Sequence, residues 1–277
     1  MPELPEVETI RRGLEQTVTG KRIRRVEVRW PGIVRGSAGR FKKKTERKRI
    51  VGTGRRGKYL LVHLSSGRSL VLHLKMSGIL RFVQADEPSN PGKHTHIIFH
   101  FTDESHLHFS ETRKFGFVEN IATQDTENYF VNKRMGPEPL DPSFSVNQFI
   151  RVLKAHPKTT VKSALLNQQI IAGIGNIYAD EALFQAKIRP TRRVRLLTKY
   201  ELTGLFHAMQ SVLREGIRNL GTTLRFYQTI FGEMGGMTDY LKVYGREGKR
   251  CERCRKENIK RIVIAGRSSH YCPRCQK

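Results

Sequence analysis

The sequence predicts an α+β protein of two domains: an N-terminal β-sandwich that opens with a helix, and a C-terminal helical domain that ends in a zinc finger. Three observations predict this class. Strand-like segments fill the first half, helical segments fill most of the second half, and all four cysteines lie beyond residue 250. A length of 277 residues with 38% hydrophobic side chains is enough for a core in each domain.

The opening segment has the features of an amphipathic helix. Pro5 suits the first turn of a helix, where its missing N–H would have no partner. Val7, Ile10 and Leu14 then recur at helical spacing, so one face is apolar. We therefore expect a helix at the N-terminus that packs on the sandwich.

The rest of the first half reads mainly as strands. Residues 22–30, 58–64, 69–74 and 94–101 are β-branched or alternating segments of strand length. Between the second and the third, Ser65-Ser66-Gly67-Arg68 is typical of a hairpin turn. Together these segments predict a β-sandwich or a flattened barrel.

The character of the sequence then changes. Residues 136–142 are rich in Pro and Gly and predict an interdomain linker. Beyond them, three segments have helical composition and spacing, namely 161–171, 177–186 and 198–220. We expect a β-sandwich domain over 1–131, a linker over 132–145, a helical domain over 146–235 and a zinc finger over 236–277.

A formal net charge of +26 points to a polyanionic partner. Basic runs recur along the chain, which favours a nucleic-acid-binding protein over a merely solvated surface. The other anionic partner would be a membrane. No apolar stretch is long enough to span one, and the N-terminus is acidic where a signal peptide would be basic. We expect no membrane contact and a cytoplasmic location.

The four cysteines have the spacing of a zinc site. Cys251-x-x-Cys254 and Cys272-x-x-Cys275 are separated by 17 residues, which fits two knuckles around one tetrahedral ion. A disulfide is disfavoured in a reducing compartment, and a redox pair needs no second CxxC. We expect one structural Zn²⁺. Residues 249–277 carry ten Lys or Arg and two Glu, so this finger is expected to face a phosphate backbone.

Pro2 is a candidate nucleophile. Removal of Met1 would expose a secondary amine, and an α-amino group has a pKa of roughly 8 against roughly 10.4 for lysine, so more of it is free base near neutral pH. Its carbonyl adduct is an iminium, a permanent electron sink. The positive end of the helix dipole would lower the amine's pKa further. The alternative is a stiff chain start followed by ordinary first-turn acids, Glu3, Glu6 and Glu8.

Two glycines precede a predicted helix at residues 173–176. Gly173 and Gly175 permit a tight turn, Asn176 is expected to be the N-cap, and the free amides of the helix could hold a phosphate. The alternative is a plain turn between two helices. In a strongly basic chain, the phosphate site is favoured.

A third cluster combines apolar and basic side chains. Met76, Arg113 and Phe115 could wedge into the stack that an extruded base has left. The alternative places Met76 and Phe115 in the core. His73, on an apolar strand, is by itself more typical of a core histidine than of a ligand.

Taken together, these residues resemble the bacterial formamidopyrimidine-DNA glycosylases, in the wider family that includes endonuclease VIII. The resemblance covers nearly the whole chain. It rests on six motifs: residues 2–9, 54–60, 73–76, 113–116, 173–181, and 265–267 leading to 271–273. It implies a helical domain of the helix-two-turn-helix type.

The resemblance also implies a set of catalytic residues. Pro2 would attack C1′ of the damaged nucleotide, and Glu3 would handle protons at the sugar. Glu6 matches a buried glutamate associated with the lesion and the N-terminus. Lys58 and Arg267 match residues that approach the phosphates and the sugar beside the lesion.

The DNA-binding residues follow in the same way. His73 and Asn176 match phosphate contacts. Met76, Arg113 and Phe115 match the trio that fills the void and faces the orphaned base. Residues 221–236 match a loop that closes over the damaged base.

These matches predict a bifunctional DNA glycosylase/AP lyase of base excision repair. It would remove 8-oxoguanine and formamidopyrimidines from duplex DNA, and cleave the strand by β,δ-elimination through a Schiff base at Pro2. We expect a monomer in a bacterial cytoplasm, associated with the nucleoid. One alternative is an endonuclease VIII-like enzyme for oxidised pyrimidines, against which Leu4 and the pair Arg113 and Phe115 speak. A non-catalytic zinc-finger regulator leaves Pro2 unexplained.

Three positions depart from the family pattern. Arg255 follows the first CxxC where glycine is usual, and the segment between the two CxxC pairs looks one residue longer. Leu220 stands where a second glycine is common, and Phe226 where a small or acidic residue is usual. These departures bear on the turn of the knuckle and on the lesion preference, and leave the implied chemistry unchanged.

Overall fold

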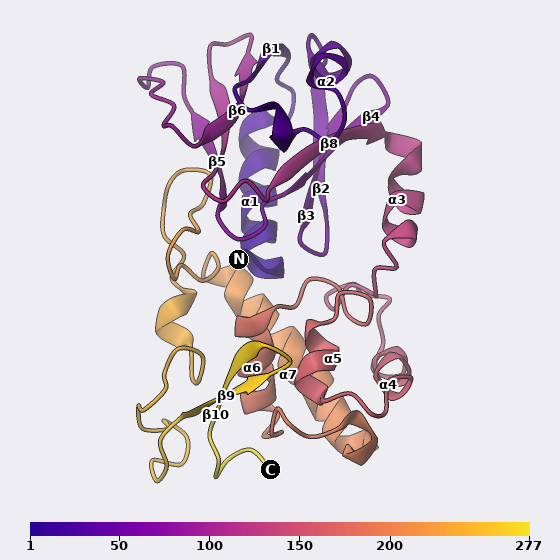
Figure 1. Cartoon of the computed structure of the whole chain (residues 1–277), viewed down its shortest axis with the longest axis vertical. Helices are drawn as coiled ribbons and strands as arrows, with labels where there is room; N and C mark the ends of the chain where they lie inside the picture. Colours follow the sequence, from indigo (N-terminus) through magenta and orange to yellow (C-terminus); the bar gives the residue numbers. More distant parts are fainter. The chain divides into compact units, whose positions relative to one another are not determined.

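The structure is a computed structural model that describes residues 1–277. The chain divides into two compact units. Unit 1 contains Met1–Asn132 and Asn219–Thr238, and unit 2 contains Lys133–Arg218 and Asp239–Lys277. The first part of unit 1 and the zinc-finger end of unit 2 are the indigo and yellow parts of Figure 1.

Unit 1 is a β-sandwich with an opening helix, as the sequence predicts. Its helices are α1 (Leu4–Val18), α2 (Ala38–Thr45) and α3 (Thr126–Asn132). Its strands are β1 (Ile23–Val28), β2 (Ile50–Arg56), β3 (Tyr59–Leu64), β4 (Arg68–His73), β5 (Gly78–Val83), β6 (Thr95–Phe101), β7 (His106–Glu111) and β8 (Phe117–Ala122).

The strands form two antiparallel sheets of four. The orders are β1-β6-β7-β5 and β2-β3-β4-β8. Alternating side chains of both sheets, among them Leu60, Leu72, Ile97 and Phe109, meet in one buried cluster. This shared core is what makes the two sheets a sandwich.

Helix α1 contributes its apolar face to the same core. Val7, Ile10 and Leu14 are buried in it, so the helical spacing predicted from the sequence is confirmed. The helix lies along β2 with a defined direction. Glu15, towards the C-terminus of α1, accepts the N–H of Thr53 in the middle of β2 at 2.9 Å. Glu8, towards the N-terminus of α1, pairs with Arg55 close to the end of β2. The β2–β3 turn therefore lies at the N-terminal end of α1 (Figure 1).

Residues 219–238 leave unit 2 and join the sandwich. Ile230 is buried in the sandwich core, and its carbonyl accepts the N–H of Phe82 on β5 at 2.9 Å. Its Cγ1 lies so close to Gly13 of α1 that a Cβ there would stand 2.8 Å away. The ends of the segment meet in an antiparallel bridge between Thr222 and Gly236. This segment is thus anchored to α1 and to β5.

Unit 2 is helical and ends in a two-stranded hairpin. Its helices are α4 (Val146–Lys154), α5 (Val161–Leu166), α6 (Asn176–Gln185) and α7 (Lys199–Arg218), and its strands are β9 (Lys260–Ile264) and β10 (Arg267–Tyr271). Four short 3₁₀ turns complete the secondary structure of the whole chain. Two are in unit 1, Pro31–Ile33 and Thr123–Asp125, and the others are Val194–Leu196 and Met237–Tyr240. No helix of the chain is both long enough and apolar enough to cross a membrane.

The helix predicted over 161–171 is shorter in the structure. It ends at Leu166, and the side chain of Asn167 accepts the N–H of Gln169 at 2.9 Å. Asparagine side chains stabilise turns in this way, so the local hydrogen bond replaces helical continuation.

Candidate active site and metal centre

The N-terminal residues of unit 1 are held in a closed first turn. Glu3 is the N-cap of α1, and Pro2 and Glu3 are both buried while Met1 is exposed. The Glu3 N–H donates to Oε2 of Glu6 at 2.7 Å. The start of α1 therefore places Pro2 beside two carboxylates and at the positive end of the helix dipole.

Glu6 connects this turn to the segment 219–238. Its side chain is 1% exposed, and its second oxygen, Oε1, accepts the N–H of Thr222 at 2.7 Å. Nearby, the Tyr227 hydroxyl donates to the Leu220 carbonyl at 2.9 Å. Burial and the Glu6 charge raise the pKa of Tyr227, so it stays a neutral donor. One carboxylate thus holds two chain segments by their backbones.

Lys58 lies in the β2–β3 turn. Gly57 before it has φ +57, a left-handed conformation that glycine adopts readily, and Lys58 itself is buried. Just before the turn, Arg55 donates to Glu8 of α1 at 3.1 Å. Burial raises the pKa of Glu8, but hydrogen bonds from arginines of α1 and the charge of Arg55 outweigh it and keep that pKa below its usual value. This contact fixes the Lys58 turn at the Pro2 end of α1.

Met76, Arg113 and Phe115 form an exposed cluster. Met76 is 47% exposed and Phe115 is 55% exposed, so the alternative that placed them in the core is wrong. The Arg113 guanidinium contacts Met76 Sδ at 2.9 Å and lies 5.0 Å from the centre of the Phe115 ring. Large apolar side chains held at the surface beside a cation are suited to stacking against bases.

Glu111, for which no motif predicted a role, organises this cluster. It is fully buried, and its carboxylate accepts the N–H groups of Arg113 at 3.1 Å and Phe115 at 2.5 Å. It also accepts the hydroxyl of Ser77, next to Met76. Burial raises the pKa of Glu111, but these hydrogen bonds outweigh it, so its pKa lies below the usual value and it is charged at neutral pH. A carboxylate at the end of a strand, just before a basic turn, was the available signal.

His73 is a packed side chain rather than an exposed one. Its ring stacks on Phe117 and meets Tyr59 edge-on at 4.5 Å. Nδ1 accepts the N–H of Lys75 at 2.9 Å, so the ring proton lies on Nε2. Any phosphate contact would therefore use Nε2–H.

In unit 2, Asn176 is the first residue of α6, and Gly175 is its N-cap. The prediction of Asn176 as N-cap was thus wrong by one residue, because Gly175 takes the extended conformation that a cap needs. The Asn176 side-chain amide donates to the Ser268 carbonyl on β10 at 2.8 Å, and its oxygen is buried without a partner. Asn176 therefore joins α6 to β10, the strand that begins with the exposed Arg267.

Asp180 strengthens the same junction. It is fully buried and accepts hydrogen bonds from the Ser269 hydroxyl at 2.6 Å and the His270 N–H at 2.8 Å. The buried ammonium of Lys162 on α5 pairs with it at 2.6 Å and also donates to the Asn176 carbonyl. Removing one partner of such a pair leaves a buried charge uncompensated.

Glu181, the next residue, fixes the chain ahead of the finger. It accepts the N–H groups of residues 242, 243 and 244 at 2.8–2.9 Å. Burial raises the pKa of Glu181. No role was predicted for Asp180 or Glu181; two adjacent acids in an otherwise apolar helix were the available signal.

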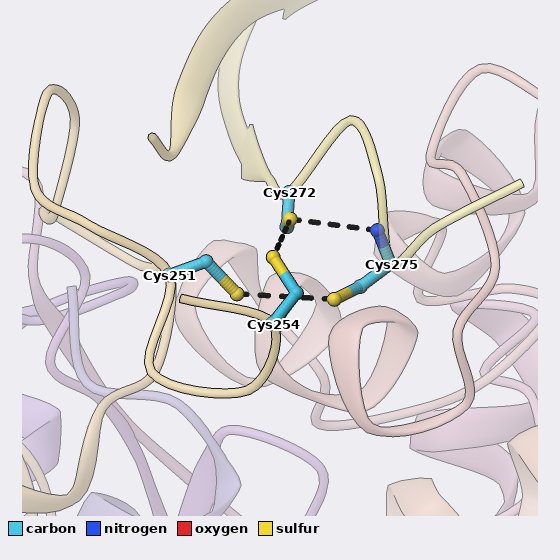
Figure 2. Close-up of side chains that lie close together, drawn as sticks. All are labelled: Cys251, Cys254, Cys272 and Cys275. Carbon is cyan, nitrogen blue, oxygen red and sulfur yellow. Dashed lines mark hydrogen bonds between the residues drawn. The ribbon is translucent and has the colours of Figure 1, made fainter. Parts of the chain in front are cut away.

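The four cysteines converge at the end of unit 2, as Figure 2 shows. The sulfur atoms of Cys251 and Cys275 are 3.9 Å apart, and those of Cys254 and Cys272 are 3.7 Å apart. Four ligands at a Zn–S distance of about 2.3 Å place the sulfurs of a tetrahedron about 3.8 Å apart. The distances are too long for disulfides and fit one structural zinc ion.

Comparison with known proteins decides the family. Residues 1–118 match the formamidopyrimidine-DNA glycosylase N-terminal domain, and residues 135–228 match the helix-two-turn-helix domain of the same enzymes. Residues 248–277 match a zinc finger found in these glycosylases and in isoleucyl-tRNA synthetases. The chain belongs to the formamidopyrimidine-DNA glycosylase family. The resemblance and the fold class predicted from the sequence are confirmed.

Individual members of this family match over their full length. The formamidopyrimidine-DNA glycosylase of Desulforamulus reducens is 45% identical, and that of Pelotomaculum thermopropionicum is 42% identical, each over 100% of this chain and 99% of the relative. A crystal structure of a Lactococcus lactis formamidopyrimidine-DNA glycosylase mutant with tetrahydrofuran-containing DNA has a TM-score of 0.93 and 37% identity, with both chains fully covered. A complex of the same enzyme with DNA that contains an abasic site has a TM-score of 0.92 over 99% of each chain.

As a formamidopyrimidine-DNA glycosylase, the protein is a DNA glycosylase for oxidised purines in base excision repair. AP lyase activity is standard for the family. The zinc finger with its four clustered cysteines fits one structural zinc.

Proposed function

We propose that Pro2 is the nucleophile of both the glycosylase and the lyase reactions, once Met1 has been removed. The observation that supports this most is the buried start of α1, where Pro2 directly precedes Glu3 and the carboxylate of Glu6 accepts the Glu3 N–H. Removal of Met1 would make the Pro2 nitrogen a secondary amine. The helix dipole and the reference pKa of an α-amino group both favour the free base near neutral pH.

The chemistry follows from that amine. The Pro2 nitrogen forms a bond to C1′ as the bond from C1′ to the damaged base breaks, and the base leaves with a proton. Opening of the sugar ring gives an iminium, whose electron-withdrawing pull makes the C2′ protons acidic. Loss of a C2′ proton expels the 3′ phosphate, and a second elimination expels the 5′ phosphate. Water then hydrolyses the iminium and regenerates the amine.

Glu3 and Glu6 have separate roles in this proposal. Glu3 moves protons at the sugar as the ring opens. Glu6 uses both carboxylate oxygens on backbone N–H groups, so it positions the start of α1 against the segment 221–236. That segment is proposed to close over the damaged base.

The phosphates beside the lesion are proposed to contact Lys58, His73, Asn176 and Arg267. Lys58 and His73 belong to unit 1, and Asn176 and Arg267 belong to unit 2. Lysine and arginine neutralise phosphate charge, and the N-terminus of α6 supplies further backbone N–H groups. Affinity for DNA should therefore fall steeply as salt rises.

Met76, Arg113 and Phe115 are proposed to fill the gap that the extruded nucleotide leaves. Their exposure and their mutual contacts support this role. We further propose that the protein acts as a monomer on duplex DNA, in a bacterial cytoplasm and at the nucleoid. The functional parts would be 1–131, 132–145, 146–235 and 236–277.

Borohydride reduction tests the nucleophile. With an 8-oxoguanine duplex it should link the protein to DNA, and peptide mapping should locate the adduct at residue 2. A variant with one extra residue ahead of Pro2 should give no adduct and no strand nicking, because its Pro2 nitrogen is an amide. Full lyase activity in that variant would refute the proposal. Comparing excision from 8-oxoguanine:C and thymine-glycol duplexes tests the preference for purines, which should be at least about tenfold.

A further inference from the structure

Unit 1 carries a group of basic residues apart from those proposed to contact the lesion. The group consists of residues 42–44 and 47–49, all Lys or Arg, and is called the α2 basic surface below. None of the six has a carboxylate within ion-pair distance, whereas neighbouring cations do, such as Lys21 with Asp103 and Arg24 with Glu104. The one acid inside the surface, Glu46, is engaged by the N–H of Val26 at 2.9 Å.

The packing of α2 turns these cations outward. Phe41 and Thr45 are the buried residues of the helix, which packs on β1 and β8. Lys43 lies on the opposite side of the helix from Phe41 and is exposed, as are Arg47 and Arg49. Three of the cations are therefore exposed, and the other three, Lys42, Lys44 and Lys48, are half-buried beside them.

This surface is at the far end of α1 from Pro2. Ile50, next to Arg49, exchanges backbone hydrogen bonds with Gly20 at 2.8 Å and Lys21 at 2.9 Å, just beyond the C-terminus of α1. Pro2 precedes the N-terminus of the same helix. A helix of 15 residues is about 22 Å long, so roughly that distance separates the two ends. Figure 1 places α2 at the end of unit 1 opposite the mark N.

Stability of the fold does not account for this charge. The three lysines in the last turn of α2 interact favourably with the helix C-terminus, but residues 47–49 lie beyond the helix. Like charges crowded on one surface repel each other. A membrane surface would need apolar anchors, and residues 38–49 expose no large apolar side chain. The regularly spaced phosphates of a nucleic acid can pair with several of these cations at the same time.

We propose that the α2 basic surface binds the phosphate backbone of duplex DNA outside the stretch that holds the lesion. The lesion-holding residues contact the DNA near the damaged nucleotide, whereas this surface contacts either a distant part of the same duplex or a second duplex. It raises the affinity for long and undamaged DNA. The contacts are to phosphates, so they carry no sequence preference.

Two matched triple variants test the proposal. The first replaces Lys42, Lys43 and Lys44 by Gln, and the second replaces them by Arg. Gln, Lys and Arg have similar helix propensities, so the two variants differ mainly in charge. The Arg variant should keep the melting temperature of the unchanged protein, and the Gln variant should melt slightly lower, because it loses the favourable interaction with the helix C-terminus. A hairpin-closed lesion duplex of about 10 base pairs reaches about 17 Å to either side of its centre, and a duplex of about 60 base pairs reaches about 100 Å.

On the long duplex, the Gln variant should bind roughly tenfold more weakly at physiological salt, and the slope of log K against log salt should fall by about 2 to 3. The Arg variant should behave like the unchanged protein. On the short lesion duplex, both variants should excise the base at the unchanged rate, which separates failure of this proposal from failure of the proposed Pro2 chemistry. Equal slopes on the long duplex for the Gln variant and the unchanged protein would overturn the proposal, as would an equal loss on both duplexes.

A further experiment distinguishes a second DNA molecule from a distant part of the same duplex. An undamaged duplex is added to the complex of the protein with the short lesion duplex. Capture of that duplex by the unchanged protein, and not by the Gln variant, assigns the surface to a second DNA molecule. Loss of affinity on the long duplex without such capture assigns it to a distant segment of the same molecule. Charge-dependent binding to anionic lipid vesicles with no effect on DNA would overturn the proposal.

Discussion

Oε1 of Glu6 accepts the backbone N–H of Thr222 at 2.7 Å, across a sequence separation of 216 residues. The other oxygen of the same carboxylate accepts the N–H of Glu3. A single buried side chain therefore fixes the start of α1 and the entry to the segment 219–238 in one arrangement. Because both partners are backbone groups, the arrangement depends on the carboxylate and on little else in the local sequence.

Replacing Glu6 by Gln should weaken this arrangement. An amide has one acceptor oxygen, so its NH₂ group would face one of the two backbone N–H groups. Leaving a buried polar group unsatisfied costs about 1 to 3 kcal/mol, which urea unfolding should show. The Thr222 amide should also exchange its hydrogen faster. The exposed Glu104→Gln is the control and should change stability by less than about 0.5 kcal/mol. Unaltered exchange at Thr222 in the Glu6 variant would contradict the linking role.

Leu220 is held in a left-handed conformation, with φ +58. This conformation costs a side-chain-bearing residue about 1 to 2 kcal/mol, and glycine avoids most of that cost. Leu220→Gly should therefore stabilise the protein, by about 0.5 kcal/mol after the extra flexibility of unfolded glycine is counted. Leu224→Gly is the matched control: Leu224 is also exposed but has no positive φ, so this variant should not gain stability. Thermal and urea unfolding measure both. A loss of stability in Leu220→Gly would show that contacts of the leucine outweigh its strain.

The zinc knuckle contains the same kind of strain. Arg255, exposed after the first CxxC, has φ +51 and donates its N–H to the Cys251 carbonyl at 2.9 Å. The turn is thus the one that glycine favours, formed here by arginine. Arg255→Gly should slow the release of zinc to a chelator by roughly fivefold, equivalent to about 1 kcal/mol. Lys256→Gly, one residue further and without a positive φ, should not slow it. Equal release rates in all three proteins would refute this prediction.

The outer face of the sheet β1-β6-β7-β5 carries a cluster of three histidines. His100, His106 and His108 have ring contacts with one another, with centres 4.6 and 6.0 Å apart. Burial, the neighbouring histidines and two arginines lower the pKa of His108 to about 4. Burial also lowers the pKa values of His100 and His106. The folded state therefore favours the neutral rings.

Acid should therefore destabilise the folded protein. Since the folded pKa of His108 lies below the unfolded value of about 6.5, stability is complete above pH 6.5 and is lost as pH falls towards 4. The loss due to this residue should be up to about 3 kcal/mol. His108→Gln should reduce the difference in unfolding free energy between pH 7 and pH 4.5. His156→Gln, an exposed histidine of unit 2, is the control. Parallel pH profiles for the two variants would contradict the assignment.

Some elements were readable from the sequence because their local pattern agrees with their environment. The four strand segments predicted at 22–30, 58–64, 69–74 and 94–101 correspond to β1, β3, β4 and β6. The other four strands of the sandwich, β2, β5, β7 and β8, were not predicted. Residues 50–56 contain two glycines and two arginines, which is not a strand pattern; they form a strand because β3 lies beside them and pairs with their backbone. The helix at 161–171 was too long because Asn167 forms a turn.

By itself, the sequence determined the residues with intrinsic chemistry and fixed spacing: a proline that can become an N-terminal amine, and two CxxC pairs that suit one ion. These are properties of residue type and of short separation along the chain. Only the tertiary structure decided which buried acids hold the site in place. Glu181 accepts backbone N–H groups, and Glu111 and Asp180 accept backbone N–H groups in addition to side-chain partners. Every residue except proline has a backbone N–H, so the sequence does not indicate which residue donates to each carboxylate. Folding alone brings donor and acceptor together.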